Sequence, residues 1–183
     1  SIILVKELRE KETMDEIEKI AKMISDTLST ELNIKVYISI GTVVSDLKDV
    51  SRSYKEAKMA LEVGKIFESE KYIVNYEKLG IGRLIYQLPL SLCKMFIKEV
   101  LHGLTMDDFD EETLATVNKF FENNLNVSET SRQLYIHRNT LVYRLDKLQK
   151  MTGLDLRNFD DAIIFKITLM VSKYMMYMDK MVY

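Results

Sequence analysis

The sequence of 183 residues has few of the residue types that build covalent or metal-dependent sites. It contains one cysteine, Cys93, two histidines, His102 and His137, and no tryptophan. A lone cysteine excludes an internal disulfide and favours a reducing compartment, so we expect a cytoplasmic protein in which Cys93 fills part of a core. The two histidines lie far apart in sequence and have no partners at metal-ligand spacing. We therefore predict that the chain is not an enzyme and holds no metal ion or cofactor.

Long hydrophobic runs and proline are also scarce. The most apolar stretch is interrupted by Lys166 and Thr168, which leaves it short of the roughly 20 residues that cross a bilayer, so we expect no membrane partner. We also expect no signal peptide. Because the chain opens with Ser1 followed directly by an apolar stretch, we expect a fragment of a longer protein. The only proline, Pro89, interrupts an otherwise helical stretch, 79–104. It predicts a domain boundary at 88–90 and two domains, residues 1–88 and 89–183.

The first part of the chain mixes the periodicities of strands and helices. Thr13 and Glu16 form the pattern of a capping box, which predicts a helix with an apolar face from Met14 to Leu28. A second helix is expected over 47–63, with Tyr54 on its apolar side and Gly64 as its end. Apolar runs and alternation predict strands at 2–5, 34–44 and 71–75. The predicted fold class is therefore α+β, with an α/β region followed by an all-helical domain.

The second part reads as helices. Acidic residues between Asp107 and Glu112 open a helix that runs through Phe121, and they can cap that helix or repel phosphate from this surface. The last helix, about 160–183, is apolar on both sides. It fits either an internal core helix or a dimer interface.

Residues 126–151 have the pattern of a helix-turn-helix. Asn126 and Glu129 predict a reciprocal capping box at the start of a first helix, from about Val127 to Leu134. A turn at Tyr135 and Ile136 then leads to a second helix that ends before Gly153. Apolar residues at helical spacing close a small core between the two helices: Val127, Leu134, Ile136, Leu141, Leu145 and Leu148. The turn position normally prefers glycine because its φ is positive.

The polar residues of this motif have the chemistry of a DNA-binding surface. At the start of the second helix, Arg138 can bind guanine bidentately and Asn139 can bind adenine in the same way, with Thr140 and Tyr143 also within reach of bases. The phosphate contacts predicted for the two helices come from Ser128, Thr130, Arg132 and Arg144. His137 and Lys147 complete the predicted DNA-binding set. Five basic and two acidic residues give 126–150 a net charge of +3, against −2 for the whole chain.

The run LYIHRNTLVYRLDKL with the following TGLDLRNFDDAIIFKI resembles the C-terminal DNA-binding domain of the PucR-type regulators of purine and sugar-diacid catabolism. The order of strands and helices before it, with Ile38-Ser39-Ile40-Gly41, resembles the second half of a GGDEF-like domain without the Gly-Gly-Asp-Glu-Phe hairpin. The resemblance implies a transcriptional regulator that binds double-stranded DNA. It also implies that the small-molecule effector is sensed by a domain outside this fragment.

Two functions stay open at this point. In the first, the chain reads DNA directly, and we expect a homodimer or higher homo-oligomer whose two-fold symmetry matches palindromic half-sites. In the second, the chain is a nucleotide-binding or dimerising signalling module that does not read DNA directly. The effector, the target genes and the sign of regulation are not determined by the sequence.

Overall fold

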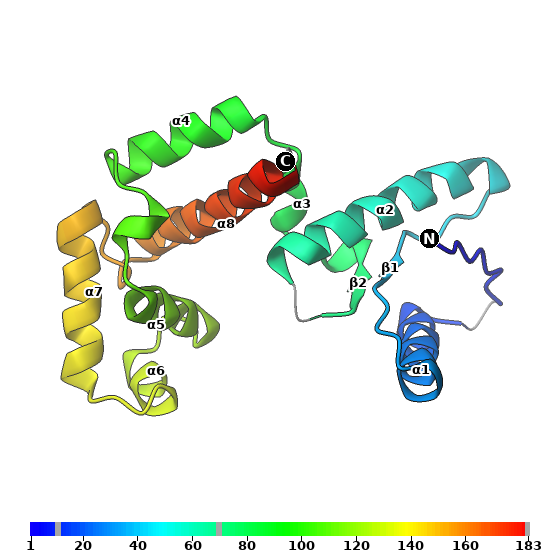
Figure 1. Ribbon diagram of the computed structural model, residues 1–183, viewed down its shortest axis with the longest axis horizontal. Helices are drawn as coiled ribbons and strands as arrows, with labels where there is room; N and C mark the ends of the chain where they lie inside the picture. The colour runs from blue at the N-terminus through cyan, green and yellow to red at the C-terminus, as the bar shows by residue number, and fades with distance from the viewer. Residues whose placement is uncertain (10–11, 69–70, 182–183) are drawn as a thin grey trace. The chain divides into compact units, whose positions relative to one another are not determined.

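The computed structural model describes residues 1–9, 12–68 and 71–181. They are mostly helical, and the chain divides into two compact units, residues 1–84 and 85–183 (Figure 1). The predicted assignment of residues 1–88 and 89–183 to two domains stays a prediction.

The first unit places two helices around a two-stranded sheet. Helix α1 (Met14–Leu32) and helix α2 (Val50–Phe67), which follows a 3-10 turn (Leu47–Asp49), lie on opposite sides of strands β1 (Ile38–Ile40) and β2 (Ile73–Asn75) (Figure 1). The strands are parallel, with Ile38 opposite Ile73 and Ile40 opposite Asn75. A further 3-10 turn (Tyr76–Lys78) follows β2. This unit is the partial α/β region that the sequence predicted, with less strand than expected.

Helix α1 confirms its predicted start and buried face. The Thr13 backbone N–H donates to the Glu16 carboxylate at 2.8 Å, which is one half of the predicted capping box. Ala21 is buried at the middle of the apolar face. A left-handed Asn33 then ends the helix.

Predictions for this unit are wrong at residues 2–5, at 34–44 and at Tyr54. Residues 2–5 form no strand in the described part of the chain, and Ile2 is 99% exposed, because no neighbouring strand there takes up their backbone hydrogen bonds. The strand predicted at 34–44 shrinks to three residues, because its partner β2 is also three residues long. Tyr54 is 43% exposed, and the buried face of α2 lies further along the helix, at Ala60, Val63, Gly64 and Ile66.

Gly64 does not end α2, which continues to Phe67. It is a buried contact point instead: a Cβ at this position would lie 2.5 Å from Val74 Cγ2. A second close approach occurs at Gly41, whose Cβ would lie 2.1 Å from the Ser53 carbonyl oxygen. Gly41 therefore allows α2 to approach the segment after β1 closely.

The second unit is entirely helical. Helix α3 (Gly82–Tyr86) lies at the boundary and Pro89 precedes α4 (Leu90–Leu101), as the proline predicted. A 3-10 turn (Met106–Asp108), α5 (Glu111–Glu122), α6 (Val127–Gln133), α7 (Arg138–Thr152) and α8 (Phe159–Met181) follow. The part of the last predicted helix at 182–183 lies outside the described residues.

The core of this unit lies where α5, α7 and α8 meet. Its fully buried members include Phe120 of α5, Leu141 and Leu145 of α7, and Phe165 of α8. The Phe165 and Phe109 rings meet edge to face at 5.9 Å. Cys93 is also buried, and burial raises the pKa of its thiol, in line with the expected packing role.

Candidate DNA-binding surface

Helix α6 begins where the sequence places it. The Asn126 side-chain oxygen accepts a hydrogen bond from the Glu129 N–H at 3.0 Å, so Asn126 is the N-cap. The reciprocal half of the predicted capping box is wrong. The Glu129 carboxylate turns away from the cap and binds the Arg132 guanidinium and, at 2.7 Å, the Gln133 amide.

The turn between α6 and α7 passes through Tyr135, whose φ of 54° is left-handed. Its backbone is held by hydrogen bonds from Tyr135 N–H to the Arg132 carbonyl and from Ile136 N–H to the Ser131 carbonyl. Leu134 and Ile136 on either side pack against the core. The positive φ that the motif predicts at this position is thus adopted by a tyrosine.

Helix α7 begins at His137, whose Nδ1 accepts a hydrogen bond from the Asn139 N–H at 3.2 Å. The imidazole therefore caps the helix and lies at its exposed N-terminal end. The helix ends at Gly153, with a φ of 79°, as predicted.

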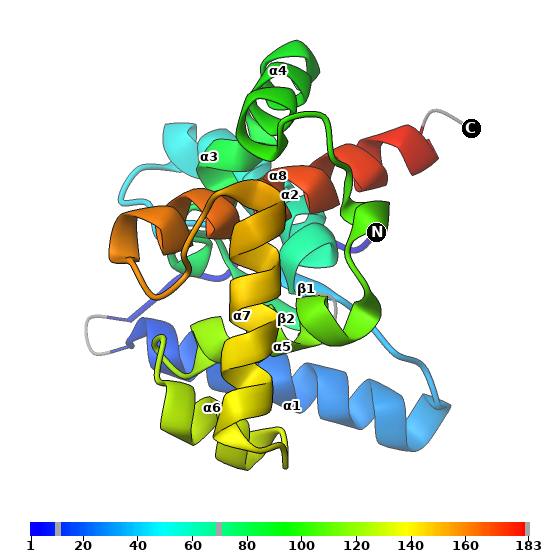
Figure 2. The same cartoon turned by 90° about the vertical axis from the view of Figure 1, so that its left-hand side faces the viewer.

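One side of α7 is buried and the other faces solvent. Leu141, Leu145 and Leu148 are almost fully buried. Helical periodicity places Asn139 and Tyr143 opposite them and Thr140 at the flank of the exposed face. Arg138 is the first residue of the helix and lies at its N-terminal end. All four are exposed. In Figure 2, α7 lies in front of the other helices of its unit, with α6 beside its N-terminal end.

The structure places the three residues of α6 that were predicted to contact phosphate in different environments. Ser128 is exposed. Thr130 is 0% exposed, and its hydroxyl donates to the Asn126 carbonyl at 2.7 Å. The prediction for Thr130 is therefore wrong, because it faces the interior one turn after the cap. Arg132 is exposed but already paired with Glu129.

Arg144 and Lys147 are held against α5. The Arg144 guanidinium donates to the Thr116 hydroxyl at 2.9 Å and to the Glu112 carboxylate at 2.7 Å, and only 20% of its side chain is exposed. Lys147 Nζ lies 2.6 Å from Asp110 Oδ2. Both residues project toward α5 and lie to one side of the exposed face of α7. The sequence predicted a phosphate contact for Arg144 and a DNA contact for Lys147, but in the structure their charges are already paired with Glu112 and Asp110.

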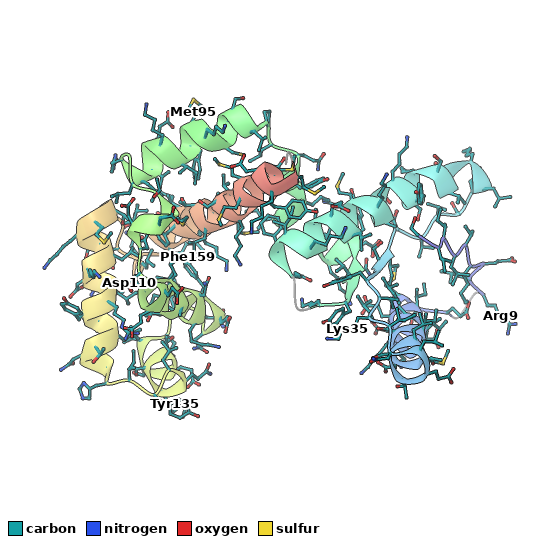
Figure 3. All side chains as sticks on the ribbon, in the orientation of Figure 1. Arg9, Lys35, Met95, Asp110, Tyr135 and Phe159 are labelled. Carbon is teal, nitrogen blue, oxygen red and sulfur yellow. The ribbon has the colours of Figure 1, made fainter. Side chains whose placement is uncertain are left out.

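The carboxylate of Asp110 has two partners. It caps α5 by accepting a hydrogen bond from the Thr113 N–H at 2.7 Å and pairs with Lys147 (Figure 3). These contacts hold the pKa of Asp110 well below the usual range of a carboxyl. The capping interpretation of the acidic run is therefore confirmed at Asp110.

The ion pairs leave little unpaired positive charge on the motif. Among the described residues, Arg138 and Lys150 are the basic side chains of 126–150 that have no ion-pair partner. Lys150 lies on the same exposed stripe as Asn139 and Tyr143, seven residues beyond Tyr143. Lys150 is not among the predicted DNA-binding residues, although its helical spacing from Asn139 and Tyr143 indicates this position.

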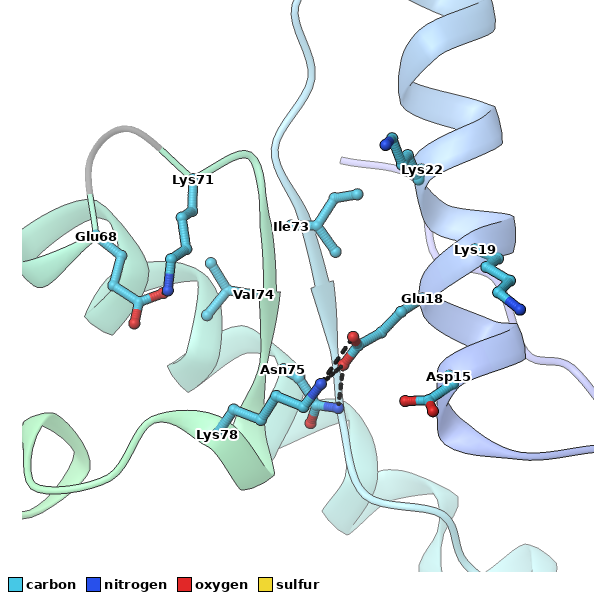
Figure 4. Close-up of a pocket in the computed structure, with 10 residues that line it drawn as sticks. All are labelled: Asp15, Glu18, Lys19, Lys22, Glu68, Lys71, Ile73, Val74, Asn75 and Lys78. Atoms are coloured by element: carbon cyan, nitrogen blue, oxygen red, sulfur yellow. Dashed lines mark hydrogen bonds and ion pairs between the residues drawn. The ribbon is translucent and has the colours of Figure 1, made fainter.

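A pocket of about 460 Å³ in the first unit lies between α1 and the loop and strand around β2 (Figure 4). The Glu18 carboxylate in it accepts hydrogen bonds from Asn75 at 3.1 Å and Lys78 at 2.8 Å. Glu68 pairs with Lys71 at its rim. The Glu18 contacts attach α1 to the segment around β2, whereas Glu68 and Lys71 pair with each other within the segment that precedes β2.

No helix in the described part of the chain is long and apolar enough to cross a membrane. Within the same residues, no group of histidine, cysteine and acidic side chains could hold a metal ion.

Comparison with known proteins assigns both parts of the chain. Residues 113–171 match the PucR C-terminal helix-turn-helix domain, and residues 1–63 match a GGDEF-like domain. The matched helix-turn-helix domain spans α5, α6 and α7 and most of α8. Its boundaries contain every residue of the exposed face described above.

Three similar proteins are regulators. The chain is 28% identical over 147 residues to the purine catabolism regulatory protein of Bacillus subtilis, covering 80% of this chain and 28% of that protein. It is 31% identical over 140 residues to the carbohydrate diacid regulator of Escherichia coli, covering 76% and 36%. It is 27% identical over 162 residues to the proline-responsive transcriptional activator PutR of Bacillus subtilis, covering 85% and 39%. The chain thus spans between 28% and 39% of the length of these relatives.

The fold and the surface define a helix-turn-helix domain of the kind found in DNA-binding transcriptional regulators. More narrowly, the chain contains a PucR C-terminal helix-turn-helix domain preceded by a GGDEF-like region.

Proposed function

We propose that this chain is the DNA-binding end of a transcriptional regulator and that α7 enters the major groove of double-stranded DNA. The observation that carries the proposal is the N-terminal end of α7, where His137, Arg138, Asn139 and Thr140 are consecutive and all exposed. His137 caps the helix, but Arg138, Asn139 and Thr140 are not needed for packing, since the core of this helix comes from Leu141, Leu145 and Leu148. Their donors and acceptors match base edges in the major groove.

The residues divide into two roles in this proposal. Arg138, Asn139, Thr140 and Tyr143 contact base edges, because they occupy the first two turns of the exposed face. Ser128 and Arg132 of α6, with Lys150 further along α7, contact phosphates and set the register of the domain on the duplex. Arg144 and Lys147 support α7 from the side of α5.

The partners of the whole protein belong to the same proposal. A two-fold homodimer would place two copies of α7 on half-sites one helical turn apart. The similar proteins extend well beyond the matched region, so we place effector sensing in a domain outside these residues. Because the proposed target is chromosomal DNA, the proposal also assigns the protein to the bacterial cytoplasm.

Selection of duplexes from a random pool with the 183-residue chain tests the proposal. We expect enrichment of a short sequence, arranged as an inverted repeat if the chain assembles with two-fold symmetry. Arg138→Ala should weaken binding to the selected duplex by about 1–3 kcal/mol and reduce discrimination at one base position. Thr130→Ser, at a buried position, is the matched control and should leave base preference unchanged.

The outcome that contradicts direct readout is a pool with no enriched sequence, together with an Arg138→Ala chain that binds as the unmodified chain does. The alternative function, a nucleotide-binding or dimerising module, predicts heat on titration with guanine nucleotides and no retardation of any duplex.

A further inference from the structure

Tyr135 is an unusual residue at the tip of the helix-turn-helix. Its backbone is left-handed, with a φ of 54°, a conformation that a side chain with a Cβ disfavours and that glycine adopts freely. Its side chain is 96% exposed. Folding of the turn therefore does not require a tyrosine, and glycine would meet the backbone geometry with less strain.

The side chain of Tyr135 has no structural role within the described part of the chain. No hydrogen bond, ion pair or ring contact involves it there. The turn is held by backbone hydrogen bonds and by the burial of Leu134 and Ile136 on either side. Because these neighbours are directed into the core, the phenol ring is directed into solvent.

The location of Tyr135 connects it to the proposed DNA-binding surface. It lies two residues before the His137 cap and three before Arg138. Figure 3 shows Tyr135 projecting beside α6, from the connection that leads to the N-terminal end of α7. A duplex that receives this end of α7 in its major groove brings a phosphate strand past the connection between the two helices.

We propose that Tyr135 is a further DNA contact, in which its phenolic hydroxyl donates a hydrogen bond to a phosphate oxygen beside the groove that α7 enters. This inference rests on the proposed function. Tyrosine hydroxyls are common phosphate donors in protein–DNA complexes, and such contacts position a protein without reading sequence. Because the tyrosine hydroxyl is neutral, its contact releases no counterion from the DNA, whereas a lysine or arginine contact does. The two kinds of contact therefore differ in the salt dependence of binding.

Binding of the 183-residue chain to its selected duplex and to a shuffled duplex of equal length tests the assignment. Tyr135→Phe keeps the ring and the backbone but removes the donor, so we expect roughly five- to tenfold weaker binding to both duplexes. The ratio of the two affinities and the slope of log K against log salt should both stay as in the unmodified chain.

Tyr135→Gly provides a second test in which folding and binding change in opposite directions. Its melting temperature should equal or exceed that of the unmodified chain, because the left-handed backbone is no longer strained, while its affinity should fall at least as far as that of Tyr135→Phe. Arg138→Ala is the comparison variant and should lower the ratio of the two affinities.

Each result decides the assignment. Equal loss on both duplexes with an unchanged salt slope supports it. If both Tyr135 variants bind like the unmodified chain while Arg138→Ala loses discrimination, Tyr135 is no DNA contact although the proposed function stands. Weaker binding by Tyr135→Gly alone also overturns the hydroxyl contact, since the ring would then be responsible. An unmodified chain that retards neither duplex overturns the proposed function itself.

Discussion

Asp110 connects the acidic run to the DNA-binding motif through one carboxylate. It caps α5 through the Thr113 N–H and binds Lys147 of α7, while Glu112 and Thr116 bind Arg144 one turn away. Helix α7 is thereby attached to α5 along the side that faces away from Asn139. We regard Asp110 and Glu112 as positioning residues for α7.

The charge of Asp110 gives this attachment a dependence on pH. Because the pKa of Asp110 is depressed in the folded chain, its contribution to stability is present above the unfolded carboxyl pKa of about 3.9 and is lost as the pH falls through the lower folded pKa. Asp110→Asn keeps a good cap but removes the charge. We expect its melting temperature to be roughly 1–4 °C below that of the unmodified chain at pH 7, with the difference shrinking below about pH 4.

Asp107→Asn is the matched control for this measurement. Asp107 is an exposed acidic residue in the same run, without a hydrogen bond or ion pair among the described residues. It should melt like the unmodified chain at both pH values. A loss in Asp110→Asn that stays constant from pH 7 to pH 3 would contradict the ion-pair interpretation.

At the scale of elements, the contact of α2 with β2 depends on the missing side chain of Gly64. In an open helix, alanine is favoured over glycine by about 1 kcal/mol. Here the added Cβ would lie 2.5 Å from Val74 Cγ2, and Val74 is itself buried. We expect overpacking to exceed the gain in helix propensity, so that Gly64→Ala lowers the free energy of unfolding by roughly 1–2 kcal/mol in a urea titration.

Two further variants separate this contact from helix propensity. Ser51→Ala, at an exposed position of the same helix, should change the free energy of unfolding by less than about 0.5 kcal/mol. The double variant Gly64→Ala with Val74→Ala should lose less stability than the sum of its single changes, because Val74→Ala makes room for the new methyl group. A Gly64→Ala chain as stable as the unmodified one would show that α2 can move away from β2.

At the scale of the whole molecule, the distribution of unpaired charge sets the salt dependence of DNA binding. The net charge of the chain is −2, so attraction to DNA has to come from a local surface. Within the described ranges, Arg138 and Lys150 are the exposed basic side chains of α7 that have no ion-pair partner, whereas Lys147 is paired with Asp110 before DNA arrives.

Lys150→Ala should therefore reduce the steepness of log K against log salt by about 0.9, the value for one phosphate contact on duplex DNA. Lys147→Ala removes the same charge from the same helix but should change the slope by much less. Fluorescence anisotropy with a shuffled duplex, over a range of salt concentrations, measures both slopes. Equal changes in the two variants would mean that the Asp110 ion pair opens on binding.

The sequence predicted helices more closely than strands, for a physical reason. The cap at Asn126, the break at Pro89 and the end at Gly153 are local signals, carried by a few adjacent residues, and the structure has each of them where it was predicted. Residues 2–5 and the ends of 34–44 have strand-like periodicity, but a strand also needs a neighbour with which to form hydrogen bonds. No local pattern supplies that neighbour.

The same distinction applies to the DNA-binding surface. Sequence by itself determined the helix-turn-helix, its leucine core and the polar run His137 to Thr140, because helical periodicity assigns residues to faces. Only the tertiary structure decided that Thr130 is buried, that Arg144 and Lys147 bind carboxylates of α5, and that Arg138 and Lys150 keep unpaired charge. The two ion pairs depend on Glu112 and Asp110, which lie more than thirty residues before Arg144 and Lys147 and reach α7 through packing of the core.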